Sequence, residues 1–151
     1  MRFGQLYSST QERASDTLEL FSGRTDYTRL KGIKEWNFGL FEAQPERLQP
    51  KFRPGATSFE DLFVPYGGEG VDQVGERMLV TLTEVMEQAE AEPVLAVSHG
   101  GAMWAFYLKI AAQALDPKVR FGNCAICHYH YEPGHFKLAE VIDPLTGSVY
   151  E

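Results

Sequence analysis

The sequence of 151 residues predicts a single α/β domain, residues 1–151, and three observations indicate that class. An apolar run at 93–97 is followed by Ser98-His99-Gly100-Gly101, and the sequence then turns helical through Trp104 to Ala114, which indicates a strand buried on both faces of a parallel sheet that runs into a helix. Apolar residues spaced by three and four over 71–89 indicate a long amphipathic helix. The order of elements, with strands and helices alternating before a final hairpin, is typical of an α/β protein.

Composition and charge exclude several other classes. Apolar residues make up 44% of the chain, which argues against disorder, and the net charge of −7 provides no general attraction for nucleic acid or an anionic membrane. The longest apolar runs are too short to span a bilayer, and the chain does not open on a charged and then apolar leader. We therefore expect a cytoplasmic protein with no nucleic-acid or membrane partner.

The first two elements are a strand over 3–7 and a helix that ends at Gly23. Ser9, with Glu12 three residues later, has the pattern of a capping box that would start this helix. Arg13 then lies in the first turn, near the carboxyl end of the strand. It is either an anion-binding residue or an ordinary solvated arginine.

A strand over 27–30 leads into a segment rich in aromatic residues that carries Glu35. Desolvation by aromatic side chains favours the protonated form of a carboxyl group, as a general acid requires, although Glu35 could instead face solvent. Prolines and glycines over 44–55 and 65–70 predict an excursion above the sheet edge, with a short helix over 58–63. Such excursions commonly select substrates.

His99 and Gly100 follow the buried strand at the start of the next helix. Free N–H groups and the helix dipole favour an anion at such a position, and glycine lets the backbone approach a ligand closely. The alternative is a tight turn in which His99 only forms a local hydrogen bond.

Two strands, 123–131 and 136–142, form a predicted hairpin. Cys124 and Cys127 precede His128 in a string that resembles a haem or zinc motif. On a strand, however, cysteines three residues apart point to opposite faces and cannot bind one ion together. We therefore interpret these residues as structural and expect no metal site.

Four motifs, in order along the chain, resemble those of the histidine phosphatase superfamily, which includes phosphoglycerate mutases and broad phosphatases. They are Leu6-Tyr7-Ser8-Ser9 with Arg13-Ala14 and Thr17, the run Glu35 to Glu42, Gly67-Gly68-Glu69 with Arg77, and Val97-Ser98-His99-Gly100-Gly101. Ala43 and Gly70 stand where the family usually has a glycine and a serine. The resemblance implies a phosphoglycerate mutase-like three-layer αβα fold.

The resemblance also implies roles for individual residues. Arg13, His99 and Gly100 would bind a phosphoryl group, and Glu35 would protonate the leaving oxygen and later activate water, with His99 and Glu35 counted as catalytic. Arginine and histidine cations take the place of a metal, so no cofactor is implied. The expected ligand is a phosphorylated small molecule or inorganic phosphate.

The family's opening Arg-His-Gly strand, which carries the nucleophilic histidine, has no counterpart in these residues. Arg2-Phe3-Gly4 only echoes it, because Phe3 cannot act as a nucleophile. We therefore expect an N-terminally truncated fold and impaired catalysis. We also expect that a homo-oligomer covers the exposed sheet edge or that a rearrangement of the fold closes the gap.

Two functional hypotheses remain. The first is a phosphomonoester hydrolase, favoured over a mutase because the excursion is not conspicuously basic. The second is a catalytically impaired phosphate-binding or interaction module. An α/β-hydrolase is excluded because it needs a Gly-x-Ser-x-Gly elbow, which the chain lacks. Trp36, Phe59, Phe63 and Tyr66 either line an apolar substrate pocket or pack in the core.

Overall fold

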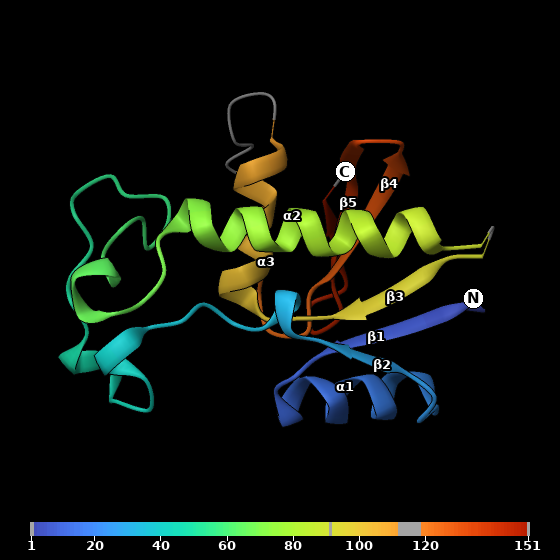
Figure 1. Ribbon diagram of the computed structural model, residues 1–151, viewed down its shortest axis with the longest axis horizontal. Helices are drawn as coiled ribbons and strands as arrows, with labels where there is room; N and C mark the ends of the chain where they lie inside the picture. Colours follow the sequence, from blue (N-terminus) through green and yellow to red (C-terminus); the bar gives the residue numbers. More distant parts are fainter. Residues whose placement is uncertain (1, 91, 112–118, 151) are drawn as a thin grey trace.

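The computed structural model describes residues 2–90, 92–111 and 119–150. A parallel sheet of three strands organises the first two thirds of the chain, with strand order β2-β1-β3. The strands are β1 (Gln5–Ser9), β2 (Thr28–Leu30) and β3 (Val94–Val97). Their carboxyl ends face one edge of the sheet. The whole segment between β2 and α2, residues 31–70, lies at the same edge and is called the excursion from here on (Figure 1).

Three helices flank this sheet. Helix α1 (Glu12–Ser22) lies on one side, and α2 (Val71–Gln88) lies on the other, next to α3 (Gly100–Ile110) (Figure 1). The predicted amphipathic helix over 71–89 is confirmed to within one residue, because its repeating apolar positions supply the face that the core covers. The predicted α/β class is therefore confirmed.

The main core lies between α2, α3 and the excursion. Trp36 and Phe63 come from the excursion, Met78 from α2 and Phe106 from α3, and each of these side chains is almost completely buried. Gly75 allows α2 to approach α3 closely, since a Cβ at that position would lie 2.9 Å from the carbonyl oxygen of Ala105. Trp36 and Phe63 thus anchor the excursion to the core of the domain.

A second, antiparallel sheet contains β4 (Ile126–Glu132), β5 (His135–Asp143) and β6 (Ser148–Tyr150). The predicted hairpin is confirmed as β4 and β5, but β4 begins at Ile126 rather than at 123, so Cys124 does not lie on the strand as expected, and β6 was not predicted. The rings of Tyr129 and Phe136 pack edge-on against Phe106 at 5.3 and 5.2 Å, which joins this sheet to α3. Among the described residues, no strand of one sheet pairs with a strand of the other.

The cysteine string forms no chelating cluster. Cys127 lies half-buried on β4, where burial raises the pKa of its thiol to about 12, while Cys124 is exposed and precedes the strand. Within the described ranges, no group of three or more His, Cys, Asp or Glu side chains is arranged to hold a metal ion. The helices described in those ranges are also too short or too polar to cross a membrane.

Several predicted boundaries were wrong. The first strand lies two residues later than 3–7, and the capping box does not form, because Ser9 ends β1 and its hydroxyl faces His99 instead. Residues 58–63 form turns rather than a helix, and a 3-10 turn follows at Val64–Tyr66. Helix α3 starts at Gly100, directly after His99 as expected, and the predicted end of this helix at 112–114 lies outside the described residues.

Strand β3 also differs from its prediction. Its four residues, Val94–Val97, are all only half-buried, whereas the apolar run predicted a strand covered on both faces. The reason is its place in the sheet: β1 pairs with it on one side, and no described strand pairs with it on the other.

Candidate functional site

The candidate site lies at the carboxyl edge of the parallel sheet, where β1 and β3 end. The Oγ of Ser9, the last residue of β1, lies 2.7 Å from Nε2 of His99, which precedes α3. The Ser9 Oγ also accepts a hydrogen bond from the N–H of Gln11 at 3.1 Å, so its own hydrogen is free to point at the imidazole. Two segments that are 90 residues apart in sequence thus meet through one hydrogen bond.

The electrostatic surroundings of His99 disfavour its charged form. Burial lowers the pKa of His99 to about 4, and the positive charges of Arg13 and Arg77 act in the same direction. Only 7% of the residue is exposed. His99 is therefore neutral at pH 7 when no anion is bound.

Glu35 lies beside this pair, at the start of α3. Its Oε1 accepts hydrogen bonds from the N–H groups of Trp36 at 2.8 Å and Ala102 at 2.9 Å, and its Oε2 accepts one from Gly101 at 3.4 Å. The Gln11 side chain in turn accepts the N–H of Glu35 at 2.8 Å. The carboxylate is thereby fixed at the positive end of the helix dipole.

Glu35 changes the anion site that the sequence predicts at this helix. The N–H groups of Gly101 and Ala102 already bind its carboxylate, which leaves the exposed Gly100 as the first residue of α3. Gly101 permits this arrangement, since a Cβ there would lie 2.7 Å from Oε1 of Glu35. An incoming anion would meet Gly100 rather than the whole helix terminus.

Arg13 lies in the first turn of α1, as predicted, and its side chain is exposed. It is close enough to His99 for its positive charge to contribute to the lowered pKa of the imidazole. The four predicted site residues, Arg13, Glu35, His99 and Gly100, therefore gather at one edge of the sheet.

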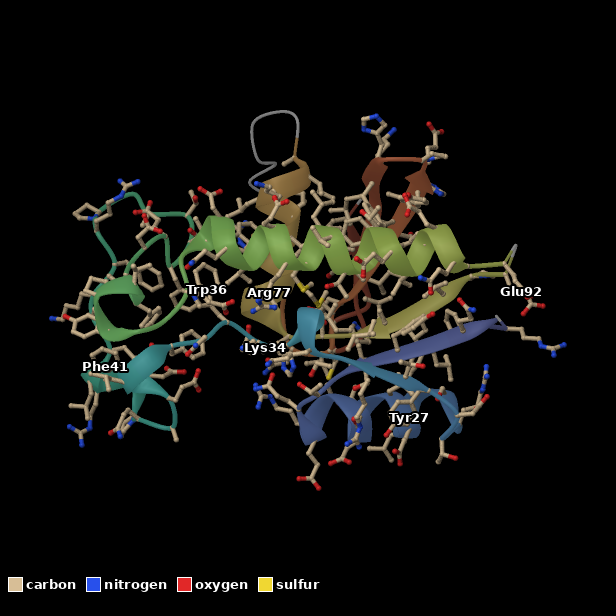
Figure 2. All side chains as sticks on the ribbon, viewed as in Figure 1. Tyr27, Lys34, Trp36, Phe41, Arg77 and Glu92 are labelled. Carbon is tan, nitrogen blue, oxygen red and sulfur yellow. The ribbon has the colours of Figure 1, made fainter. Side chains whose placement is uncertain are left out.

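Arg77 supports the site from α2 (Figure 2). Its Nη1 donates to the carbonyl oxygens of Gly32 and Lys34 at 2.8 and 2.9 Å, and its Nη2 donates to that of Glu35 at 3.0 Å. The same guanidinium binds both carboxylate oxygens of Glu69, at 2.8 and 3.0 Å. Arg77 thus holds the backbone that presents Glu35.

Ser9 and Gln11 were not predicted as site residues. Ser9 could have been found from its place at the end of a strand next to that of His99, but its resemblance to a helix cap concealed this role. No sequence signal marks Gln11. Of the four candidate pocket aromatics, Trp36 and Phe59 line an apolar cavity, although Trp36 is itself almost completely buried, whereas Phe63 is a core residue and Tyr66 packs edge-on against Phe41 at 4.9 Å.

The fold and the site together define an α/β protein whose polar centre, built around a histidine, lies at the carboxyl edge of a parallel sheet. A model of the histidine phosphatase superfamily (branch 1) matches residues 1–144, and the chain belongs to that family. The resemblance noted from the four motifs is thereby confirmed.

Two curated relatives from Arabidopsis thaliana are similar to this chain. A metal-independent phosphoserine phosphatase is 27% identical over 135 residues, which cover 82% of this chain and 55% of the relative. Phosphoglycerate mutase-like protein 4 is 24% identical over 114 residues, with 70% and 50% covered. The chain therefore spans about half the length of the curated relatives that it matches.

Solved structures share the fold. The phosphoserine phosphatase of Entamoeba histolytica, solved as a histidine-to-alanine mutant in complex with phosphoserine, superposes with a TM-score of 0.67 at 21% identity, covering 92% of this chain and 73% of that one. The same enzyme with 3-phosphoglyceric acid gives 0.65 at 23% identity, with the same coverage. The product of the open reading frame Rv3214 from Mycobacterium tuberculosis gives 0.62 at 22% identity, covering 89% and 69%.

Proposed function

We propose that this chain is a phosphomonoester hydrolase of the histidine phosphatase type. In this proposal, Arg13, His99 and the N–H of Gly100 bind the phosphoryl group, and Glu35 donates the proton to the leaving oxygen. The observation that supports it most is the meeting of β1, the excursion and α3 at one polar edge, through the bonds of Ser9 to His99 and of Glu35 to Ala102.

The electrostatics of the site suit an anionic ligand even though the chain as a whole is acidic. Arg13 is exposed, and its guanidinium is available to a phosphoryl oxygen at the mouth of the site. A bound phosphate would also offset the positive charges that, together with burial, keep His99 neutral. The ligand would thereby convert His99 into a second cation.

A catalytically impaired phosphate-binding module is the second candidate. His99 faces Ser9 through Nε2, and the other three histidines, His128, His130 and His135, are exposed residues of the second sheet. The family mechanism implied by the motifs needs a histidine that attacks phosphorus, in addition to the one that binds phosphate. An attack by His99 itself would require it to release Ser9.

Hydrolysis of p-nitrophenyl phosphate and calorimetric binding of inorganic phosphate, measured on the same preparation, test the proposal. Arg13→Ala and His99→Ala should each weaken phosphate binding by about tenfold or more, since each removes a partner of the charged oxygens. Arg47→Ala, which removes an exposed arginine from the excursion, is the matched control and should change nothing.

Three results are distinguishable. Turnover that both variants abolish supports the hydrolase. Phosphate binding without turnover supports the binding module. A folded chain that neither binds phosphate nor hydrolyses the ester overturns both.

A further inference from the structure

An apolar cavity of about 280 Å³ adjoins the candidate site. Its walls include the aromatic rings of Trp36, Phe52, Phe59 and Trp104, and Gly101 lies at its border with the site. Trp36 is labelled in Figure 2 where the excursion meets the start of α2. Gly101 and Trp104 belong to α3, and the other lining residues belong to the excursion, so the cavity lies between these two elements.

The cavity and the proposed acid share a boundary. Trp36 and Gly101 both line the cavity, and the N–H group of each donates to the Glu35 carboxylate, at 2.8 and 3.4 Å. A phosphoryl group beside His99, with its ester oxygen directed at Glu35, would extend its organic group past Gly101. That group would then lie among the aromatic rings.

The walls of the cavity are held in place before any ligand arrives. Trp104 donates its indole N–H to the carbonyl oxygen of Thr57 at 2.7 Å, which ties the excursion to α3. Phe59 packs edge-on against Trp36 at 5.1 Å and stacks on Phe52 at 5.3 Å. Phe52 nevertheless remains 55% exposed, so a ligand could still cover part of its surface.

The cavity offers nothing to a second charged group. Its described lining contains no Lys, Arg or His. Its polar side-chain groups are the hydroxyls of Thr57 and Ser58 and the indole N–H groups of Trp36 and Trp104, which already donate to the carbonyl oxygens of Glu69 and Thr57. Arg53, close by in sequence, is bound through two nitrogens to the carboxylate of Glu60 at 2.6 and 2.7 Å. A carboxylate or ammonium group placed in the cavity would lose its hydration without gaining a partner.

We propose that this site selects phosphomonoesters whose organic group is apolar, such as aryl or benzyl phosphates, and discriminates against phosphoserine and phosphoglycerate. The selection would depend on Phe52, Phe59 and Trp104 as specificity-determining residues. This proposal rests on the proposed phosphate site. It assigns the substrate class of that site by the chemistry of its neighbouring cavity.

The test compares three non-hydrolysable or inert probes by calorimetry on the full chain: inorganic phosphate, benzylphosphonate, and the phosphonate analogue of phosphoserine. Benzylphosphonate should bind more tightly than the other two by about tenfold or more, because it buries an aromatic ring. Non-hydrolysable probes make the result independent of turnover.

Two variants identify the cavity as the cause. Phe52→Ala should remove most of the preference for benzylphosphonate and leave phosphate binding unchanged. Phe21→Ala is the matched control, because Phe21 is a phenylalanine on α1 with 57% exposure, and it should retain the preference.

Phosphate binding without a preference for the aromatic probe overturns this inference and leaves the proposed function intact. Equal or tighter binding of the phosphoserine analogue also overturns it. If none of the three probes binds to the folded chain, the proposed function and this inference both fail.

Discussion

His99 is subject to burial and to two arginine charges, all of which oppose its protonation. Its folded-state pKa of about 4 lies below the ordinary value of 6.5. The unfolded chain therefore takes up a proton as pH falls through 6.5, while the folded chain does so only near 4. Between these two values, acidification destabilises the fold through His99, and at higher pH this contribution is constant.

A bound anion should reverse this effect. Phosphate beside His99 stabilises the imidazolium, so we expect saturating phosphate to raise the pKa of His99 well above 4 and to make binding proceed with proton uptake below pH 7. NMR titration of the imidazole Hε1 signal, with and without phosphate, measures this, and His99→Ala assigns the signal. A titration curve that phosphate leaves unchanged would contradict the role of His99 as an anion ligand.

At the scale of elements, α2 stabilises the segment that presents Glu35. Arg77 and Glu69 are each only 18% exposed, and the guanidinium satisfies three backbone carbonyls as well as the carboxylate. Burial raises the pKa of Glu69, but the hydrogen bonds from Arg77 and from the N–H of Asn37 outweigh this effect, so its net pKa lies below the usual value. The pair therefore stabilises the fold at neutral pH, and this stabilisation is lost as the carboxylate is protonated in acid.

Replacing Arg77 by methionine should lower the free energy of unfolding by about 3 kcal/mol, because it leaves a half-buried carboxylate and three carbonyls without their donor. Urea denaturation followed by tryptophan fluorescence measures the change. Arg53→Met is the control, since it breaks an exposed pair with Glu60 and should leave the stability nearly unchanged. Equal effects of the two substitutions would show that Arg77 has no special structural role.

At the scale of the whole molecule, the two sheets leave β3 with an outer edge that no described strand covers. Its residues are apolar yet half-exposed, and unpaired backbone groups on such an edge favour pairing with another chain. A homo-oligomer that covers this edge therefore remains our prediction. Light scattering coupled to gel filtration, at several concentrations, should detect a dimer or larger particle.

Amide hydrogen exchange adds a local readout to that experiment. The amides of β3 should become more protected as the protein concentration rises, whereas those of α1 should not change. A particle that stays monomeric over the whole concentration range, with constant exchange at β3, would contradict the prediction.

Local patterns in the sequence determined much of this protein. The spacing of apolar residues specified α2, the alternation of strands and helices specified the class, and four motifs pointed to Arg13, Glu35, His99 and Gly100. These features can be predicted from sequence because each depends on residues close together in the chain. A helical face is set by apolar residues three and four positions apart, and each motif is a short run of residues that binds one chemical group. Boundaries were less accurate, because helix starts depend on which partner a polar side chain finds.

Only the tertiary structure decided what those side chains do together. Ser9 forms a hydrogen bond with His99 instead of capping α1. The Glu35 carboxylate accepts hydrogen bonds at the start of α3, where the sequence predicts a bound anion. The half-exposure of β3 and the aromatic cavity beside Gly101 likewise depend on distant segments. The physical reason is the same in each case: hydrogen-bond competition and burial are set by residues brought together from remote parts of the chain, so no local pattern records their outcome.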